Sequence, residues 1–270
     1  MARPDFVIGL IKKVFVRDMK KASVTRLPLV GRVVESLLFE GDHLICLPND
    51  RVVEVNRDLD GKEQMALPSA LAEHYVDRAS HRFLMDFCIC RKSMGCKDYP
   101  EDFGCLFLGE PVLSINPGWG RLVSPEEAKA HLKRCRDKGL VHFVGRSKLD
   151  TVWLGIGPGD RLFTICSCCP CCCITRAVPY VSESLAEKIH RAPGVTVTVS
   201  DDCAGCGACA RNVCFCQAIT ISDGRAVISD ECRGCGRCVS VCPSQAISVN
   251  VDFAVFEKQS LADLAGKVNL

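Results

Sequence analysis

The sequence predicts an α+β fold in two parts, in which a cysteine-rich N-terminal α+β domain precedes a smaller C-terminal domain. Two observations lead to this prediction. Helical apolar periodicity and short strand-like runs are interspersed through the first 175 residues. The 21 cysteines fall mostly into three blocks, and the last block occurs as two similar copies. The predicted boundaries are 1–175 for the N-terminal domain, 176–195 for a connecting helix or linker, 196–252 for the C-terminal domain and 253–270 for a tail.

The N-terminal segment should form a helix, because apolar residues recur at positions 6, 7, 10, 11, 14 and 15. Lysines and arginines between and after these positions make the helix basic. We interpret it as a helix that packs on its own domain and keeps its basic face in solvent. The alternative is peripheral contact of residues 5–21 with a membrane surface or with a docking partner.

Two apolar runs, 43–47 and 51–55, flank a Pro-Asn-Asp turn and are predicted to form a β-hairpin. A helical pattern then covers residues 68–87. This helix should place Cys88 and Cys90 at its C-terminal end.

The segment Ser124-Pro125-Glu126-Glu127 has the features of a helix N-terminus. Serine can cap the helix, proline suits the first turn, and glutamate three residues after the serine completes a capping box. This helix should end at Gly139. Short apolar runs predict strands at Leu140–Val144, Val152–Ile156 and Leu162–Ile165, and a further helix is predicted at Ser182–Arg191. Asp223-Gly224 predicts a hairpin turn between the two cysteine copies.

Composition and charge argue against several classes of protein. The formal charge of +2 gives no reason to expect nucleic-acid binding. No apolar run reaches the length of a membrane span, and no signal peptide is recognisable. Many cysteines are too closely spaced to pair comfortably as disulfides. We therefore expect a reducing compartment, with the cytoplasm as the predicted location.

The second copy of the repeat has the spacing Cys232-x₂-Cys235-x₂-Cys238-x₃-Cys242-Pro243, which is typical of [4Fe–4S] binding. Three cysteines spaced three residues apart can bind three corners of one cluster. The fourth lies too far along the chain and should reach a second cluster. Gly234 and Gly236 should let backbone N–H groups approach the cluster sulfides.

The first copy, Cys203-x₂-Cys206-x₂-Cys209-x₄-Cys214, has one extra residue and lacks the usual proline. Aligning the Gln-Ala-Ile triplets that end the two copies places Cys214 opposite Cys242. The same alignment places Cys216 opposite Ser244. Cys214 is therefore the expected ligand and Cys216 the spare thiol, and the reverse assignment stays open.

These motifs resemble the bacterial-type two-[4Fe–4S] ferredoxins over about residues 196–252. The resemblance implies a pseudo-symmetric βαββαβ fold and two [4Fe–4S] clusters with crossed ligands. It implies that one cluster is bound by Cys203, Cys206, Cys209 and Cys242, and the other by Cys232, Cys235, Cys238 and Cys214. Zinc is not expected here, because the crossed three-plus-one arrangement is typical of cubane clusters and not of zinc sites.

Ten further cysteines form two blocks in the N-terminal domain: Cys88, Cys90, Cys96, Cys105, Cys166, Cys168, Cys169, Cys171, Cys172 and Cys173. Packing does not explain so many small side chains. Adjacent cysteines on an extended chain also point opposite ways, so they could belong to two clusters or approach one large cluster from two sides. We expect the two blocks to meet and jointly bind one or more additional iron–sulfur clusters. The alternatives are a non-cubane or substrate-accessible cluster, and zinc or partly free thiols.

The cysteine blocks also resemble an uncharacterised family of cysteine-rich, ferredoxin-fused iron–sulfur proteins of anaerobes, over about residues 45–250. This resemblance implies no particular reaction. Outside the blocks, four residues are interpreted as structural: Cys46, Cys135, His81 and His142.

The sequence thus favours an iron–sulfur electron-transfer protein. It would pass low-potential electrons between a redox partner protein and an N-terminal iron–sulfur site. Enzymatic activity stays open. One alternative is a reductase whose N-terminal cysteine-rich cluster is the catalytic site, and another is an activation or maturation factor that supplies electrons to a metalloenzyme.

Overall fold

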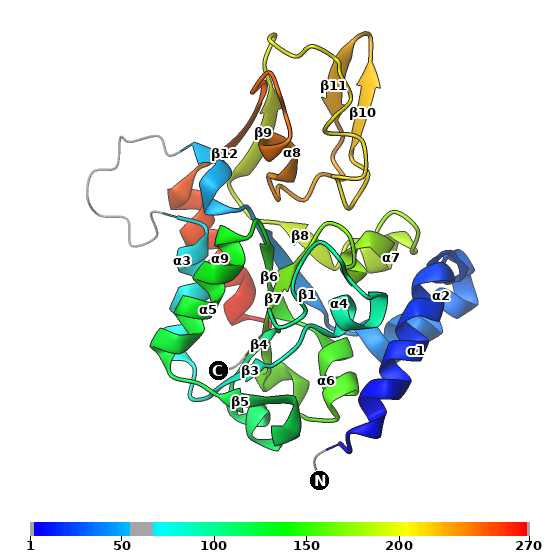
Figure 1. Ribbon diagram of the computed structural model, residues 1–270, viewed down its shortest axis with the longest axis vertical. Coiled ribbons are helices and arrows are strands. Elements are labelled where there is room, and N and C mark those ends of the chain that lie inside the picture. Colours follow the sequence, from blue (N-terminus) through cyan, green and yellow to red (C-terminus); the bar gives the residue numbers. More distant parts are fainter. Residues whose placement is uncertain (1–2, 55–66, 269–270) are drawn as a thin grey trace.

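The computed structural model describes residues 3–54 and 67–268 and contains both helices and strands, which confirms the α+β prediction (Figure 1). The strands are β1 (His43–Leu47), β2 (Val53–Glu54), β3 (Arg82–Met85), β4 (Leu106–Leu108), β5 (Gly120–Leu122), β6 (Val141–Arg146), β7 (Phe163–Cys168), β8 (Ile189–Arg191), β9 (Val195–Val199), β10 (Ile219–Ser222), β11 (Arg225–Ile228) and β12 (Ile247–Val251).

The α-helices are α1 (Phe6–Lys20), α2 (Pro28–Val34), α3 (Ser69–Arg78), α4 (Ile89–Met94), α5 (Pro125–Asp137), α6 (Lys148–Leu154), α7 (Glu183–Ala186), α8 (Arg237–Ser240) and α9 (Phe253–Ala265). Short 3₁₀ or π turns join them: η1 (Ala22–Arg26), η2 (Glu35–Phe39), η3 (Asp50–Val52), η4 (Glu110–Ser114), η5 (Pro117–Trp119), η6 (Gly159–Arg161) and η7 (Ile174–Ala177). Among the described residues, no helix is long and apolar enough to cross a membrane.

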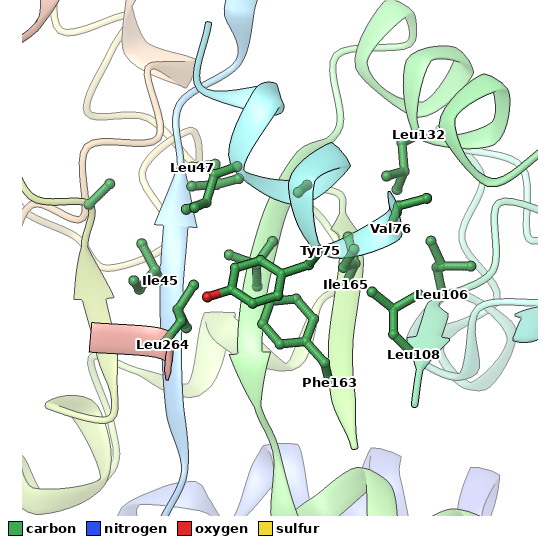
Figure 2. Close-up of a cluster of buried hydrophobic side chains, with 14 of the residues drawn as sticks. Ile45, Leu47, Tyr75, Val76, Leu106, Leu108, Leu132, Phe163, Ile165 and Leu264 are labelled. Carbon is green, nitrogen blue, oxygen red and sulfur yellow. The ribbon is translucent and has the colours of Figure 1, made fainter. Parts of the chain in front are cut away.

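A seven-stranded sheet forms the centre of the molecule, with strand order β5-β3-β4-β7-β6-β1-β8. All neighbours in this sheet are antiparallel except β1 and β8, which are parallel. Helices α3, α5 and α9 cover one face. Figure 2 shows the core on this face, where the ring of Tyr75 stacks on that of Phe163 at 4.3 Å between centroids. Leu132 from α5 and Leu264 from α9 complete this core and are fully buried.

The opposite face of the sheet is divided between two partners. Near β3 and β4, α1 and α6 pack on it through side chains such as Ile11 and Leu154, which belong to the same buried apolar cluster as Phe107. Near β6 and β1, the face lies against the C-terminal segment. There the rings of Phe143 and Phe215 meet edge to face at 5.5 Å. The second half of this face is therefore an internal interface between the two parts of the chain.

The C-terminal segment contains two small sheets. β9 and β12 pair antiparallel, and β10 and β11 form a hairpin at the predicted Asp223-Gly224 turn. Helix α8 lies between β11 and β12, whereas the corresponding stretch of the first copy, 201–218, consists of turns and extended segments. The strand order along the chain is the one that the ferredoxin resemblance implies, with turns in place of its first helix.

Several local predictions are confirmed. Helix α1 covers the predicted apolar stretch, and α5 begins with the full capping box at Ser124 and Glu127. The chain leaves α5 at Lys138, and Gly139 follows with a positive φ of 78°. Strands β6 and β7 match two of the three strands predicted after it.

The predicted hairpin of 43–47 and 51–55 is wrong. β1 pairs with β6 and β8 in the large sheet, whereas β2 pairs in parallel with β12. The side chain of Asn49 accepts the N–H of Arg51 and donates to the carbonyl of Leu140, so it anchors the turn to the end of α5. This anchor directs the chain away from β1. Residue 55 lies outside the described residues.

The helix predicted over 68–87 is wrong in its second half, because α3 ends at Arg78 and residues 82–85 form β3. The guanidinium of Arg82 donates to the carbonyls of Val76 and Ala79. These bonds satisfy acceptors that a helix end leaves without partners. Cys88 therefore follows a strand and occupies the N-cap position of the short helix α4, on which Cys90 lies.

Two other predictions need correction. The strand predicted at 152–156 is helix α6, which has Ser147 as its N-cap and Gly155 in the left-handed conformation at its end. The helix predicted at 182–191 covers only Glu183–Ala186. Its last residues form β8, which joins the large sheet beside β1.

Candidate metal centres

A small surface pocket lies between the two cysteine copies and is lined by four cysteines: Cys203, Cys206, Cys209 and Cys242. The first three come from the loop after β9, and the fourth comes from the segment between α8 and β12. Cys206 is exposed, so the pocket lies at the surface. These are the four thiols that the resemblance assigns to one cluster.

A second pocket is lined by five cysteines: Cys214, Cys216, Cys232, Cys235 and Cys238. The three cysteines of the second copy are buried, and Cys214 is half-buried. Both pockets therefore combine thiols in the three-plus-one pattern expected from the spacing, with Cys216 as an additional thiol in the second.

Glycines shape the loops that hold these thiols. Gly205, Gly207, Gly234 and Gly236 all have φ between 62° and 77°, a conformation that other residues rarely adopt. The two copies thus use the same backbone geometry at matching positions. The N–H of Gly234 donates to Cys232 Sγ at 3.4 Å, so the loop directs backbone donors toward sulfur.

The environments of Cys214 and Cys242 correspond closely. The N–H of Ala218 donates to Cys214 Sγ at 3.3 Å, and the backbone of Ala246 lies at the same offset from Cys242 and also donates to its sulfur. Contact with Cys216 and this backbone donor lower the pKa of Cys214 to about 6. The same contact and burial raise the pKa of Cys216. The backbone donor that Cys214 shares with Cys242 is consistent with Cys214 as the predicted ligand.

The two N-terminal cysteine blocks meet in space. Six of their thiols contact one another in a closed ring, in the order Cys88, Cys90, Cys173, Cys168, Cys166 and Cys105. The Sγ atoms of Cys105 and Cys166 lie 3.4 Å apart, and those of Cys168 and Cys173 lie 3.0 Å apart. The sheet explains part of this arrangement, because Cys166 and Cys168 lie on β7 two residues apart and so face the same side.

The remaining four thiols form a second group: Cys96, Cys169, Cys171 and Cys172. Their Sγ atoms all lie within 4.8 Å of one another. Within residues 3–54 and 67–268, this is the one group of three or more Cys, His, Asp or Glu side chains gathered so closely. The N–H of Cys172 donates to Cys169 Sγ at 3.3 Å, which ties the turn around Pro170 together.

Arg91 lies beside both thiol groups and is almost completely buried, with an exposed fraction of 1%. Its guanidinium donates to the carbonyls of Ser167 and Phe103, which holds the two cysteine blocks together. Burial disfavours the charged form, but the thiols of Cys88 and Cys105 raise the pKa of Arg91 above its usual value. A buried cation at this position offsets negative charge on the thiolates.

Arg237 connects the N-terminal thiols to the second C-terminal pocket. It lies between Cys235 and Cys238 in sequence, is buried, and donates to the carbonyl of Cys168 at 2.5 Å. Its guanidinium also lies 5.9 Å from the ring centre of Phe215. Nothing in the spacing of the motif singled this residue out, because its partner is distant in sequence.

The residues interpreted as structural are buried or half-buried. Cys135 is fully buried and 3.5 Å from Nε2 of His131, and burial raises the pKa of Cys135 to about 11. Burial lowers the pKa of His142 to about 3, and its ring contacts the hydroxyl of Ser167. Cys46 is fully buried on β1 and belongs to the apolar cluster that includes Cys235. That proximity depends on tertiary packing, which the sequence pattern does not reveal.

Comparison with known proteins adds one match. The family described as "LdpA Fe-S cluster-binding domain" matches residues 210–252. This match supports an iron–sulfur protein. It covers the second cysteine copy and the end of the first, including Cys214. Searches of curated proteins and of solved structures find no match to this chain.

Proposed function

We propose that this iron–sulfur protein is an electron carrier. In this proposal, two [4Fe–4S] clusters in the C-terminal segment exchange electrons with a metal centre formed by the N-terminal thiols. One cluster is bound by Cys203, Cys206, Cys209 and Cys242, and the other by Cys214, Cys232, Cys235 and Cys238. The crossed lining of the two pockets and the matching glycine conformations support these ligand sets.

The observation that carries the proposal is the contact between Arg237 and the carbonyl of Cys168. It joins the loop of the second predicted cluster directly to the ring of N-terminal thiols. The same interface is apolar, because Phe143 and Phe215 fill it from the two sides. Redox centres on either side of such a short, packed contact are suitably placed to exchange electrons.

The exposure of the thiols suggests a direction for the path. Cys206 is exposed, whereas the cysteines of the second pocket are buried or half-buried, and Arg237 joins that pocket to the N-terminal ring. A redox partner protein would then dock near the first cluster, and electrons would continue through the second cluster to the N-terminal centre.

The test follows reduction of the full-length chain, purified without oxygen. We expect iron and acid-labile sulfide in the protein, and magnetic interaction between reduced centres in its EPR spectrum. Arg237→Gln should retain both elements but slow electron transfer to the N-terminal centre. Arg233→Gln is the matched control, because Arg233 lies in the same loop and instead contacts Glu231 and the carbonyl of Ala186.

A chain whose N-terminal thiols bind no redox-active metal would contradict the proposal. So would an N-terminal centre that is reduced equally fast in both arginine variants and shows no magnetic interaction with the C-terminal clusters.

A further inference from the structure

We infer that the ten N-terminal cysteines form two separate metal centres of different kinds. Cys96, Cys169, Cys171 and Cys172 bind a single metal ion in tetrahedral thiolate coordination. The ring of six thiols binds a polynuclear iron–sulfur centre. The second statement rests on the proposed function, whereas the first is independent of it.

Distances between sulfur atoms carry the first statement. Around one tetrahedral ion with metal–sulfur bonds near 2.3 Å, neighbouring sulfurs lie about 3.8 Å apart. The four thiols of this group all lie within 4.8 Å of one another, and Cys96 and Cys171 are 3.4 Å apart. In a cubane each thiolate binds a different iron, so the cysteine sulfurs that bind it lie further apart. The C-terminal cysteines line pockets instead of converging in this way.

The local chain geometry supports a single ion. The turn Cys169-Pro170-Cys171-Cys172 presents three thiols within four residues, and Cys96 approaches from the end of α4. The guanidinium of Arg176 donates to the carbonyl of Pro170 at 2.6 Å, which fixes the turn. Four thiolates in this arrangement match the Cys₄ donor set of structural zinc sites, and Fe²⁺ or Fe³⁺ takes the same ligands.

Separation of the two centres follows from alternation along the chain. Cys168 and Cys169 are adjacent in sequence but belong to different groups, and so do Cys172 and Cys173. Neighbouring side chains on an extended chain point opposite ways, so one segment can contribute to two centres. Six thiols in the ring exceed the four that a single tetrahedral ion binds, which suits a centre with several metal ions. The ring can supply that centre without any of the four grouped thiols.

The test uses the full-length chain, purified without oxygen from cells supplied with iron and zinc. We expect one ion per chain outside the clusters, detected as zinc by elemental analysis or as mononuclear iron by its high-spin ferric EPR signal. Cells grown with cobalt should give protein with the visible spectrum of a tetrahedral Co²⁺ tetrathiolate. These measurements on the unaltered chain do not depend on the folding of any variant.

Matched serine variants then separate the centres. Cys96→Ser and Cys171→Ser should lose the single ion and the cobalt spectrum while retaining acid-labile sulfide. Cys105→Ser and Cys166→Ser, which are half-buried to a similar degree, should lose iron together with sulfide while retaining the single ion.

Loss of sulfide in Cys171→Ser, or an unaltered chain without zinc, mononuclear iron or the cobalt spectrum, would overturn the inference. Failure of the proposed electron-carrier function is distinguishable. It would appear as unchanged sulfide in Cys206→Ser and Cys235→Ser, which leave the single ion in place.

Discussion

At the scale of single residues, the two cysteine copies differ at one position beside the fourth ligand, where the first copy has Cys216 and the second has Ser244. Cys216 lies beside Cys214 with 3.6 Å between the sulfurs, and Ser244 lies beside Cys242 with 3.7 Å between sulfur and oxygen. The two neighbours occupy equivalent positions in the two copies. The hydroxyl of Ser244 thus indicates how a serine would behave at position 216.

Cys216→Ser should therefore retain all iron and sulfide, whereas Cys214→Ser should lose part of both. A hydroxyl is a stronger hydrogen-bond donor than a thiol, and donors to cluster sulfur stabilise the reduced form. We expect a more positive reduction potential for one cluster in Cys216→Ser, measured by EPR-monitored redox titration. Loss of iron in Cys216→Ser but not in Cys214→Ser would reverse the ligand assignment.

At the scale of elements, the β10–β11 hairpin supports the first cysteine loop through a close backbone contact. A Cβ added to Gly205 would lie 2.1 Å from the carbonyl oxygen of Gly224 in the hairpin turn. Gly224 also has a positive φ, of 73°, but a Cβ there would meet no atom within 4 Å. Replacing either glycine by alanine would therefore strain the backbone, but only the substitution at Gly205 would also cause a steric clash.

Gly224→Ala should cost about 1–2 kcal/mol of stability through its left-handed backbone and leave the metal content unchanged. Gly205→Ala should also displace the loop that carries Cys203 and Cys206. We expect lower iron and sulfide per chain in this variant, together with a larger fall in the free energy of unfolding. Equal behaviour of the two variants would show that the hairpin does not position the loop.

Helix α1 has exposed apolar side chains beside basic ones. Helix α1 buries Val7, Ile11 and Phe15, which confirms a helix packed on its own domain. It leaves Phe6 and Leu10 exposed at 74% and 57%, next to the basic residues of the same helix. Exposed apolar side chains with lysines and arginines suit an anionic membrane surface.

We predict that the protein sediments with anionic lipid vesicles and less with neutral ones. A Phe6→Ser and Leu10→Ser double variant should sediment less, because it removes apolar area that would enter the lipid. Leu113→Ser is the control, since Leu113 is 53% exposed on η4. Equal sedimentation of the double variant and the control would argue against contact through α1.

At the scale of the whole molecule, the sequence predicted local features better than connections. The capping box at Ser124 and the hairpin turn at Asp223 depend on neighbouring residues, and both were predicted correctly. The position of β2 is set by its pairing with β12, nearly two hundred residues later in the chain. No local sequence pattern predicts that pairing. The meeting of the cysteine blocks was predictable from their chemistry, whereas their division into groups of four and six was not.

Several elements cross between the two parts of the chain. β2 pairs with β12 of the C-terminal segment, and α9, which follows β12, packs on the core of the large sheet. A fragment ending at residue 195 would lack both β12 and α9. It would expose the part of the sheet core that Leu264 of α9 covers in the whole chain, so tests of the N-terminal thiols belong on the full chain.

The stability of the N-terminal centres should consequently depend on α9. Phe256 is fully buried in the main core, so Phe256→Ala should lower the free energy of unfolding by about 3–5 kcal/mol. Lys258→Ala, at an exposed position of the same helix, should change it by at most about 0.5 kcal/mol. Denaturant unfolding followed by far-UV circular dichroism and by visible cluster absorbance checks both values.

Because α9 covers the sheet whose other face carries the thiol ring, we expect both signals to shift to lower denaturant together in Phe256→Ala. A shift in circular dichroism alone, with cluster absorbance unchanged, would show that the metal centres are stable without this core.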